Sequence, residues 1–309
     1  MVLDTGRPGG ALVEFHPDGT HLFGGNNNGI QRWRLADRQE VGKQTGIAVG
    51  AISVSRDHKW IVCGTLEGAG VWDTGLREKV IHVEGTNDVR AVDVSPDSTR
   101  FATGTFTASI WSISGGERLV GPLLHDDYVT GIQFSPNGEH IATAHWGNSV
   151  RVFDSLGGDK LITIEIITPP KSPITPLLWS NDGRRIFVAS DDKKIKCFDI
   201  STGSQLAESQ ILNDSNGNGT VRSIALAANG SFITTYANRT IFFLDASTLT
   251  RIGPIINESE DIGSIALSPD SNNLATGRDD GKISVYNLGD ILLDVHDPPQ
   301  VSSICPFVM

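Results

Sequence analysis

One short turn recurs seven times along the 309-residue chain, and this repetition restricts the possible folds more than any other feature of the sequence. In its clearest form the turn reads Ser-Pro-Asn-Gly at 135–138, and the related turns begin at His16, Ser55, Ser95, Ser180, Ala227 and Ser268. The start-to-start spacings are 39, 40, 40, 45, 47 and 41 residues. Proline fixes φ, and Asp, Asn and Gly tolerate positive φ, so each copy predicts a tight reversal between two strands.

Short runs of alternating apolar and polar residues surround each turn. Around 135–138 they read VTGIQF before the turn and then IATA and RVFD, and no convincing amphipathic helix interrupts the pattern. A period near 40 residues with strand-like content is typical of a propeller blade. A small sheet cannot bury both of its faces alone, so neighbouring sheets must stack around an axis. The sequence therefore predicts an all-β fold, a seven-bladed β-propeller of four-stranded antiparallel blades. We expect a single domain over 1–309, with blades near 10–47, 48–87, 88–127, 128–172, 173–219, 220–260 and 261–296, and a tail or closing strand at 297–309.

The third strand of each unit carries a large apolar residue, often followed by Asp. Trp72–Asp73 is the one literal Trp-Asp pair, and the equivalents include Trp33–Arg34, Trp111–Ser112, Phe153–Asp154 and Phe198–Asp199. Seven such units in register resemble the WD-repeat (WD40) β-propeller family over roughly residues 10 to 295. The stretch 121–144 is similar to the repeats of fungal-type WD40 arrays.

This resemblance implies a buried hydrogen-bond network in a blade, built from His, Ser or Thr, Asp and Trp. In the fourth unit His125, Thr143 and Phe153 match the pattern in part. The last unit has Thr276, Asp279 or Asp280, and Tyr286, but no His ahead of its first strand. We assign structural roles to His125, Thr143, Trp33, Trp72, Asp73, Trp111, Phe153, Asp154, Phe198 and Asp199. We expect the segment 291–296 to close the ring, because the N-terminus offers only three residues for a strand.

The overall composition argues against several classes of function. A formal net charge of −11 disfavours duplex nucleic acid and an anionic membrane surface as partners, since both need a basic face. Three scattered cysteines do not form a disulfide framework. No signal peptide or transmembrane segment is evident in the sequence, so we expect a cytoplasmic or nuclear protein.

Catalytic motifs are missing from the sequence as well. The pairs His16/His21 and His140/His145 straddle a turn and a strand, so their side chains need not converge on a metal. There is no phosphate-binding loop and no nucleophile elbow. We therefore predict no catalytic residues, no metal and no cofactor, and a protein that is not an enzyme.

The remaining candidates for function are surface loops on a rigid scaffold. Trp146 is predicted at an exposed turn, where Asp191 and Asp279 sit in other blades. A ring of positions at the axial mouth comprises Ala11, Gly50, Arg90, Thr130, Thr175, Arg222 and Gly263. The partner-binding candidates are Arg90, Asp126, Asp127, Tyr128, Trp146, Lys171, Asp191, Arg222 and Asp279.

The favoured function is a protein-interaction scaffold or adaptor that binds peptides or partner proteins, with acidic and aromatic or apolar residues in the bound motif. In the simplest alternative for the arginines, they pair with local carboxylates such as Asp88. In the alternative for Trp146, it folds over the neighbouring blade. The competing functions are small-ligand or glycan binding, which predicts aromatic residues at equivalent loop positions, and an enzyme at the channel mouth.

Overall fold

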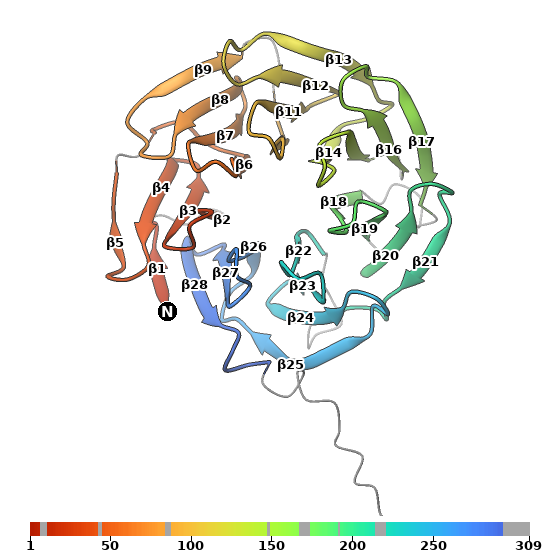
Figure 1. Cartoon of the computed structure of the whole chain (residues 1–309). Coiled ribbons are helices and arrows are strands. Elements are labelled where there is room, and N and C mark those ends of the chain that lie inside the picture. The colour runs from red at the N-terminus through yellow and green to blue at the C-terminus, as the bar shows by residue number, and fades with distance from the viewer. Residues whose placement is uncertain are drawn as a thin grey trace, which may run out of the picture.

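The computed structural model describes residues 1–6, 11–42, 45–83, 88–146, 149–166, 174–190, 192–213 and 221–292. They form seven four-stranded antiparallel sheets arranged as blades around a central axis (Figure 1). The predicted all-β, seven-bladed propeller is therefore confirmed. These ranges contain strands and turns but no helix, and hence no helix that could span a membrane.

Within each of the first six blades, four consecutive strands pair in chain order from the axis outward. The first three blades comprise β2 (Leu12–Phe15), β3 (His21–Asn26), β4 (Gly29–Arg34), β5 (Gln39–Glu40); β6 (Ala51–Val54), β7 (Trp60–Thr65), β8 (Gly68–Asp73), β9 (Lys79–Val83); and β10 (Ala91–Val94), β11 (Arg100–Gly104), β12 (Thr107–Ser112), β13 (Arg118–Leu124). The next three comprise β14 (Val129–Phe134), β15 (His140–His145), β16 (Ser149–Asp154), β17 (Lys160–Glu165); β18 (Ile174–Trp179), β19 (Arg185–Ser190), β20 (Lys194–Asp199), β21 (Gln205–Glu208); and β22 (Ile224–Leu226), β23 (Phe232–Ala237), β24 (Thr240–Asp245), β25 (Arg251–Asn257). Blade seven comprises β26 (Ile262–Leu267), β27 (Asn273–Arg278), β28 (Lys282–Asn287) and β1 (Val2–Asp4).

The N-terminus closes the ring, so the expectation of closure by 291–296 is wrong. Strand β1 pairs antiparallel with β28, Leu3 lying opposite Ile283. Leu3 is buried against apolar residues of blades one and seven, and the Met1 amino group donates to the Val285 carbonyl at 2.7 Å. Three residues are enough for this closing strand, because only its central side chain, that of Leu3, has to reach the core. After β28 the chain turns, with the Leu292 amide donating to the Leu288 carbonyl, and Leu292 is buried against blades six and seven. Residues 293–309 lie outside the described part of the chain.

The hydrophobic core consists of seven clusters, each lying between two neighbouring blades. The cluster between blades two and three, for example, packs Val62 and Val71 against Phe101 and Trp111. Small residues at the end of the second strand allow this close approach. A Cβ atom on Gly64 would lie 2.5 Å from the Val89 carbonyl oxygen of the next blade.

The recurring turn is held by its own side chains, which explains why its sequence repeats. The Ser135 hydroxyl donates to Asn137 Oδ1 at 2.7 Å, and the His140 amide donates to Ser135 Oγ at 2.9 Å. Ser95 and Asp97 form the same arrangement one blade earlier. These local bonds satisfy the backbone at the reversal.

In blade four His125 and Thr143 are hydrogen-bonded to each other. His125 Nδ1 lies 2.9 Å from the Leu123 carbonyl, to which it can only donate, so Nε2 of the neutral ring accepts from the Thr143 hydroxyl at 2.8 Å. The single hydroxyl proton is then not donated to the Arg151 carbonyl, which lies 3.2 Å away. Burial lowers the pKa of His125 to about 4, which keeps the imidazole neutral. The ring also packs 5.7 Å from that of Phe153.

The large residues of the third strands pack between blades, and the Asp residues that follow them bind the next turn. Trp33, Phe153 and Phe198 are buried, Trp72 is half-buried, and the Trp111 indole N–H donates to the Thr103 hydroxyl at 2.9 Å. Carboxylate oxygens accept backbone amides of the following turn at Asp73, Asp154 and Asp199.

Blade seven contains a polar network in which Glu258 and Arg278 were not identified from the sequence. Glu258 takes the position where blade four has histidine, and accepts from the Thr276 hydroxyl at 2.7 Å and from Arg278 Nη1 at 3.2 Å. Arg278 also pairs with Asp280. Burial alone would raise the pKa of Glu258, but hydrogen bonds from Thr276, Tyr286 and their neighbours lower it overall. A carboxylate therefore replaces the imidazole in this blade.

Candidate partner-binding site on the loop face

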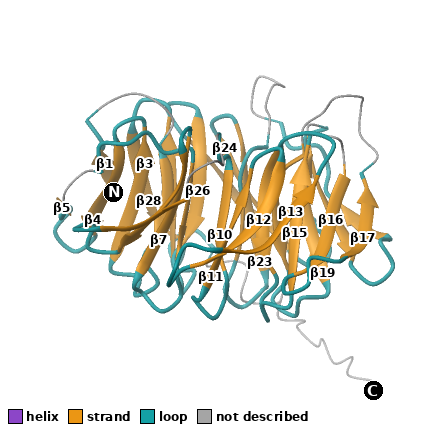
Figure 2. Cartoon of the chain, turned by 90° about the horizontal axis from the view of Figure 1, so that it is seen from above, coloured by secondary structure: helices purple, strands orange, loops and turns teal. Residues whose placement is uncertain are grey.

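The strands run between two faces made of turns and loops (Figure 2). Because each blade is an antiparallel meander, its β-turn between the second and third strands lies on the same face as the connection to the next blade. We call this side the loop face. The turns between the first and second strands, and between the third and fourth, lie on the opposite face.

Three consecutive blades present a large apolar residue at the same position of the loop face. Leu66, Phe106 and Trp146 each follow the second strand of blades two, three and four, and are 72%, 54% and 42% exposed. The equivalent positions in the other blades that the structure describes are polar: Asn27, Asn238 and Asp279. At this turn position, the exposed large apolar residues of the described blades thus lie in three consecutive blades.

Tyr128, which precedes the first strand of blade four, lies between two of these tips, Phe106 and Trp146. Its ring centroid lies 3.7 Å from that of Phe106 and 6.0 Å from that of Trp146, in an edge-to-face arrangement with the indole. The Trp146 amide donates to the Tyr128 carbonyl at 3.2 Å. We call Leu66, Phe106, Tyr128 and Trp146 the apolar arc.

Arg90 lies over the arc but is already paired. Its guanidinium carbon is 4.4 Å from the Tyr128 ring centroid and 5.9 Å from that of Trp146. Nε and Nη2 donate to Asp88 at 3.0 and 2.7 Å, and these hydrogen bonds raise the pKa of Arg90. The Asp88 amide donates to the Leu66 carbonyl at 3.0 Å, which ties this pair to the tip of blade two. Of the two interpretations of Arg90, the structure therefore shows the one in which it pairs with a local carboxylate.

The structure brings together only some of the candidates selected from the sequence. Arg90, Tyr128 and Trp146 are in contact, and Asp127 adjoins them, its Oδ1 accepting the Tyr128 amide at 2.7 Å. Asp126 forms an ion pair with Arg151. Arg222 precedes blade six and Asp279 lies in blade seven, so both are outside the arc. Lys171 and Asp191 fall outside the described residues.

Phe106 and Leu66 were not among the partner-binding candidates, although Phe106 lies near the loop position equivalent to Trp146 in the sequence and a signal exists for both. Both lie at multiples of 40 residues before Trp146, which is the spacing of the turn repeat in this part of the chain. The identity of the turn residue varies between blades, so the three positions align by register rather than by residue type.

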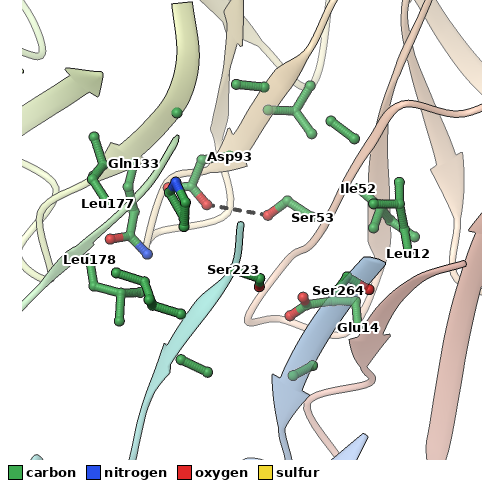
Figure 3. Close-up of a pocket in the computed structure, with 18 of the residues that line it drawn as sticks. Leu12, Glu14, Ile52, Ser53, Asp93, Gln133, Leu177, Leu178, Ser223 and Ser264 are labelled. Carbon is green, nitrogen blue, oxygen red and sulfur yellow. Dashed lines mark hydrogen bonds between the residues drawn. The ribbon is translucent and has the colours of Figure 1, made fainter. Parts of the chain in front are cut away.

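The axis of the propeller is a channel with a cavity of about 470 Å³ (Figure 3). Four equivalent positions of the first strands line it with polar side chains, which are Glu14, Ser53, Asp93 and Gln133. Three of them connect neighbouring blades: Ser53 donates to Asp93 at 3.3 Å, Asp93 accepts the Phe134 amide at 2.7 Å, and Gln133 accepts the Trp179 amide at 2.9 Å. Of the predicted mouth positions, Gly50, Arg90, Thr130 and Arg222 line this cavity.

Glu14 has no hydrogen-bond partner among the described residues. Burial, and then the charge of Asp93, raise the pKa of Glu14 to about 8. Burial also raises the pKa of Asp93 to about 7, against the lowering effect of its hydrogen bonds. Figure 3 shows Ser53 bonded to Asp93, with Glu14 on the side of the cavity next to Ser264. The described lining of this cavity includes two carboxyl groups and no His or Cys.

The histidine pairs are engaged in local contacts. His16 lies 2.9 Å from Asp18, and its ring is 5.9 Å from that of His21. His140 stacks on Trp179, and His145 bonds the Ser149 hydroxyl at 2.7 Å. Within the ranges that the structure covers, no group of three or more His, Cys, Asp or Glu residues is arranged to hold a metal ion.

Comparisons with known proteins agree with this architecture. The family model described as WD domain, G-beta repeat matches residues 119–154, 166–199 and 251–287. The chain is 26% identical over 234 residues to the U3 small nucleolar RNA-associated protein 15 homolog of Gallus gallus, covering 74% of this chain and 43% of that protein. It is 26% identical over 196 residues to the serine-threonine kinase receptor-associated protein of Gallus gallus, covering 63% and 53%.

The chain thus spans about half the length of the curated relatives it matches. Among solved structures, the β-propeller domain of Cps50 (Swd1) from Myceliophteria thermophila aligns with a TM-score of 0.78 and 18% sequence identity, over 93% of this chain and 99% of that one. At this identity the likeness establishes a shared fold alone.

Proposed function

We propose that this seven-bladed β-propeller, which matches the WD domain, G-beta repeat model in three segments, is a non-catalytic platform that binds a partner protein or peptide through the apolar arc of its loop face. The observation that carries the proposal is the exposure of Phe106 and Trp146 at 54% and 42%, beside Tyr128 and Arg90. Aromatic residues and arginine are the residue types enriched in the energetic centres of protein interfaces.

The scaffold suits this function because the tips are not members of the inter-blade core clusters. The seven inter-blade clusters hold the fold, and the turns that carry Leu66, Phe106 and Trp146 project from their ends. Binding residues on loops that a rigid scaffold positions lose little entropy on association.

A pull-down from the native cells tests the proposal. The bait is the purified chain, compared with a Phe106→Ala/Trp146→Ala variant and with Leu156→Ala as the matched control. Leu156 is 74% exposed and lies in the turn between β16 and β17, on the opposite face of blade four. We expect the double variant to lose at least about tenfold in partner recovery, and Leu156→Ala to behave as wild type. Equal recovery with all three baits would refute the role of the arc.

One observation favours a second candidate, glycan binding. Phe106 and Trp146 are aromatic residues at equivalent loop positions of adjacent blades, as such a site requires. A glycan array probed with wild type and with the double variant distinguishes the two functions. Specific glycan signals that disappear in the variant would replace the protein-binding proposal.

We also propose a nuclear or cytoplasmic location. Its support is the match to a protein named for a small nucleolar RNA. Microscopy of the tagged chain in its native cells tests this, and a secreted or surface location would contradict it.

A further inference from the structure

We propose that the partner segment that docks on the apolar arc is basic as well as apolar, carrying Lys or Arg beside its large apolar side chains. This inference rests on the proposed function and adds the charge of the partner. It reverses the expectation of an acidic motif, which assumed that the arginines of the loop face were available to a partner.

The two arginines beside the arc already have carboxylate partners. Arg90 donates two hydrogen bonds to Asp88, and Arg151 pairs with Asp126 and donates to the Leu124 carbonyl at 2.9 Å. Asp88 and Asp126 thus already neutralise these two cations. A partner carboxylate would gain less from them than from an arginine without a carboxylate partner.

Two further carboxylates lie beside residues of the arc. Glu67, next to Leu66, and Asp127, next to Tyr128, form no ion pair among the described residues. Among the described residues of these turns, they and the carboxylates of Asp88 and Asp126 give four negative charges, against the two positive charges of Arg90 and Arg151. The local balance is −2, and the whole chain carries −11, so the field near the arc attracts cations.

The aromatic side chains of the arc can also receive a cation. Arg90 covers one part of the Tyr128 ring, which shows that a guanidinium is accommodated over these aromatic side chains. Phe106 and Trp146 remain about half exposed. A cation over an aromatic face is attracted by the ring, and more strongly where water is excluded. A basic and apolar segment therefore finds both of its requirements on the arc without breaking an existing pair.

Selection from a random dodecapeptide phage library on the immobilised wild-type chain tests the inference without assuming a sequence. We expect peptides enriched in Lys or Arg together with Trp, Phe or Leu. Their binding, followed by fluorescence anisotropy of labelled synthetic copies, should weaken about tenfold in Glu67→Lys/Asp127→Lys. It should also weaken several-fold when salt rises from about 50 to 300 mM.

The matched control is Glu117→Lys/Asp159→Lys, which makes the same change of charge. Both residues are exposed and lie in turns of the opposite face, in blades three and four. This variant should bind the peptides within about twofold of wild type, which separates local charge from net charge. Trp146→Ala should abolish binding.

Each other result overturns the inference. Enriched peptides that are acidic or uncharged, no enrichment that depends on Trp146, or equal losses in both charge-reversal variants would each show that the arc does not select a basic segment. Acidic peptides that still require Trp146 would leave the proposed function intact, whereas binding that ignores Trp146 and Phe106 would remove that function too.

Discussion

Replacing Glu14 with Gln should stabilise the protein at alkaline pH and leave its stability unchanged at acidic pH. The carboxyl group lines the axial channel, and burial and Asp93 raise its pKa to about 8. A glutamate with a raised folded pKa binds more protons in the folded than in the unfolded state. Its contribution to stability is therefore complete below about pH 4.5 and is lost as pH rises through 8. Glutamine has the shape of the protonated form and cannot ionise.

The expected change in unfolding free energy follows from the shift of the Glu14 pKa. A change from 4.5 to about 8, at about 1.36 kcal/mol for each pKa unit, corresponds to roughly 5 kcal/mol for a group shielded from water. Glu14 faces the channel, and water there screens part of the effect. We therefore expect Glu14→Gln to exceed the wild type by about 1–3 kcal/mol in unfolding free energy at pH 8.5, and by nearly zero at pH 4.5.

Urea unfolding followed by tryptophan fluorescence at four pH values between 4.5 and 8.5 measures this difference. The matched control is Glu117→Gln, an exposed glutamate of the β12–β13 turn, which should not change stability at any of these pH values. A wild type that gained stability relative to Glu14→Gln as the pH rose would refute the reasoning, and so would a difference independent of pH.

Three further predictions concern what holds the ring together. The pKa of His125, measured by NMR titration of its imidazole, should lie near 4. The contribution of His125 to stability should be lost as the pH falls from 6.5 toward 4. A pKa at or above 6.5 would contradict the hydrogen bond from Thr143. Leu3→Ala should lower the unfolding free energy by about 2–3 kcal/mol in a denaturant titration, because Leu3 is the buried residue of the closing strand. Val2→Ala, at a 53% exposed neighbour, should cost little, and equal losses would argue against closure by β1. Arg278→Met should lower the unfolding free energy, measured by heat and by urea, by about 3 kcal/mol, because it leaves Glu258 charged and buried. Adding Glu258→Gln should restore part of the loss. If it restores nothing, the two residues are not coupled.

The repeat made the blade architecture predictable, because turn chemistry and strand alternation are local properties. Ring closure was not predictable in the same way. Strand β1 has three residues and one buried side chain, a signal too short to distinguish from a disordered terminus. The segment 291–296 looked the better strand by composition, yet Leu292 is buried through a turn that packs on blade six.

The site was predictable in part. Trp146 and Tyr128 could be chosen because aromatic residues are rare at predicted loop tips, and both lie in the cluster. The pairing of Arg90 with Asp88, two residues away, was one of two readings that the sequence left open, because side-chain direction decides it. Glu258 was missed for a similar reason. A buried carboxylate at the histidine position is acceptable only if Thr276 and Arg278 both reach it, and spacing alone does not show that they do.

The apolar tips occupy the same place in three consecutive blades. Leu66, Phe106 and Trp146 each lie 11 residues after the start of their turn repeat, at Ser55, Ser95 and Ser135. In the other described blades this place is taken by Asn27, Asn238 and Asp279, so residue type and not spacing restricts the arc to blades two to four. The length of the turn decides where such a tip lies relative to its neighbours. If this reasoning holds, inserting two residues into the turn after Thr105 should weaken peptide binding as strongly as Phe106→Ala. The same insertion into the turn after Ser114, on the opposite face of that blade, should not.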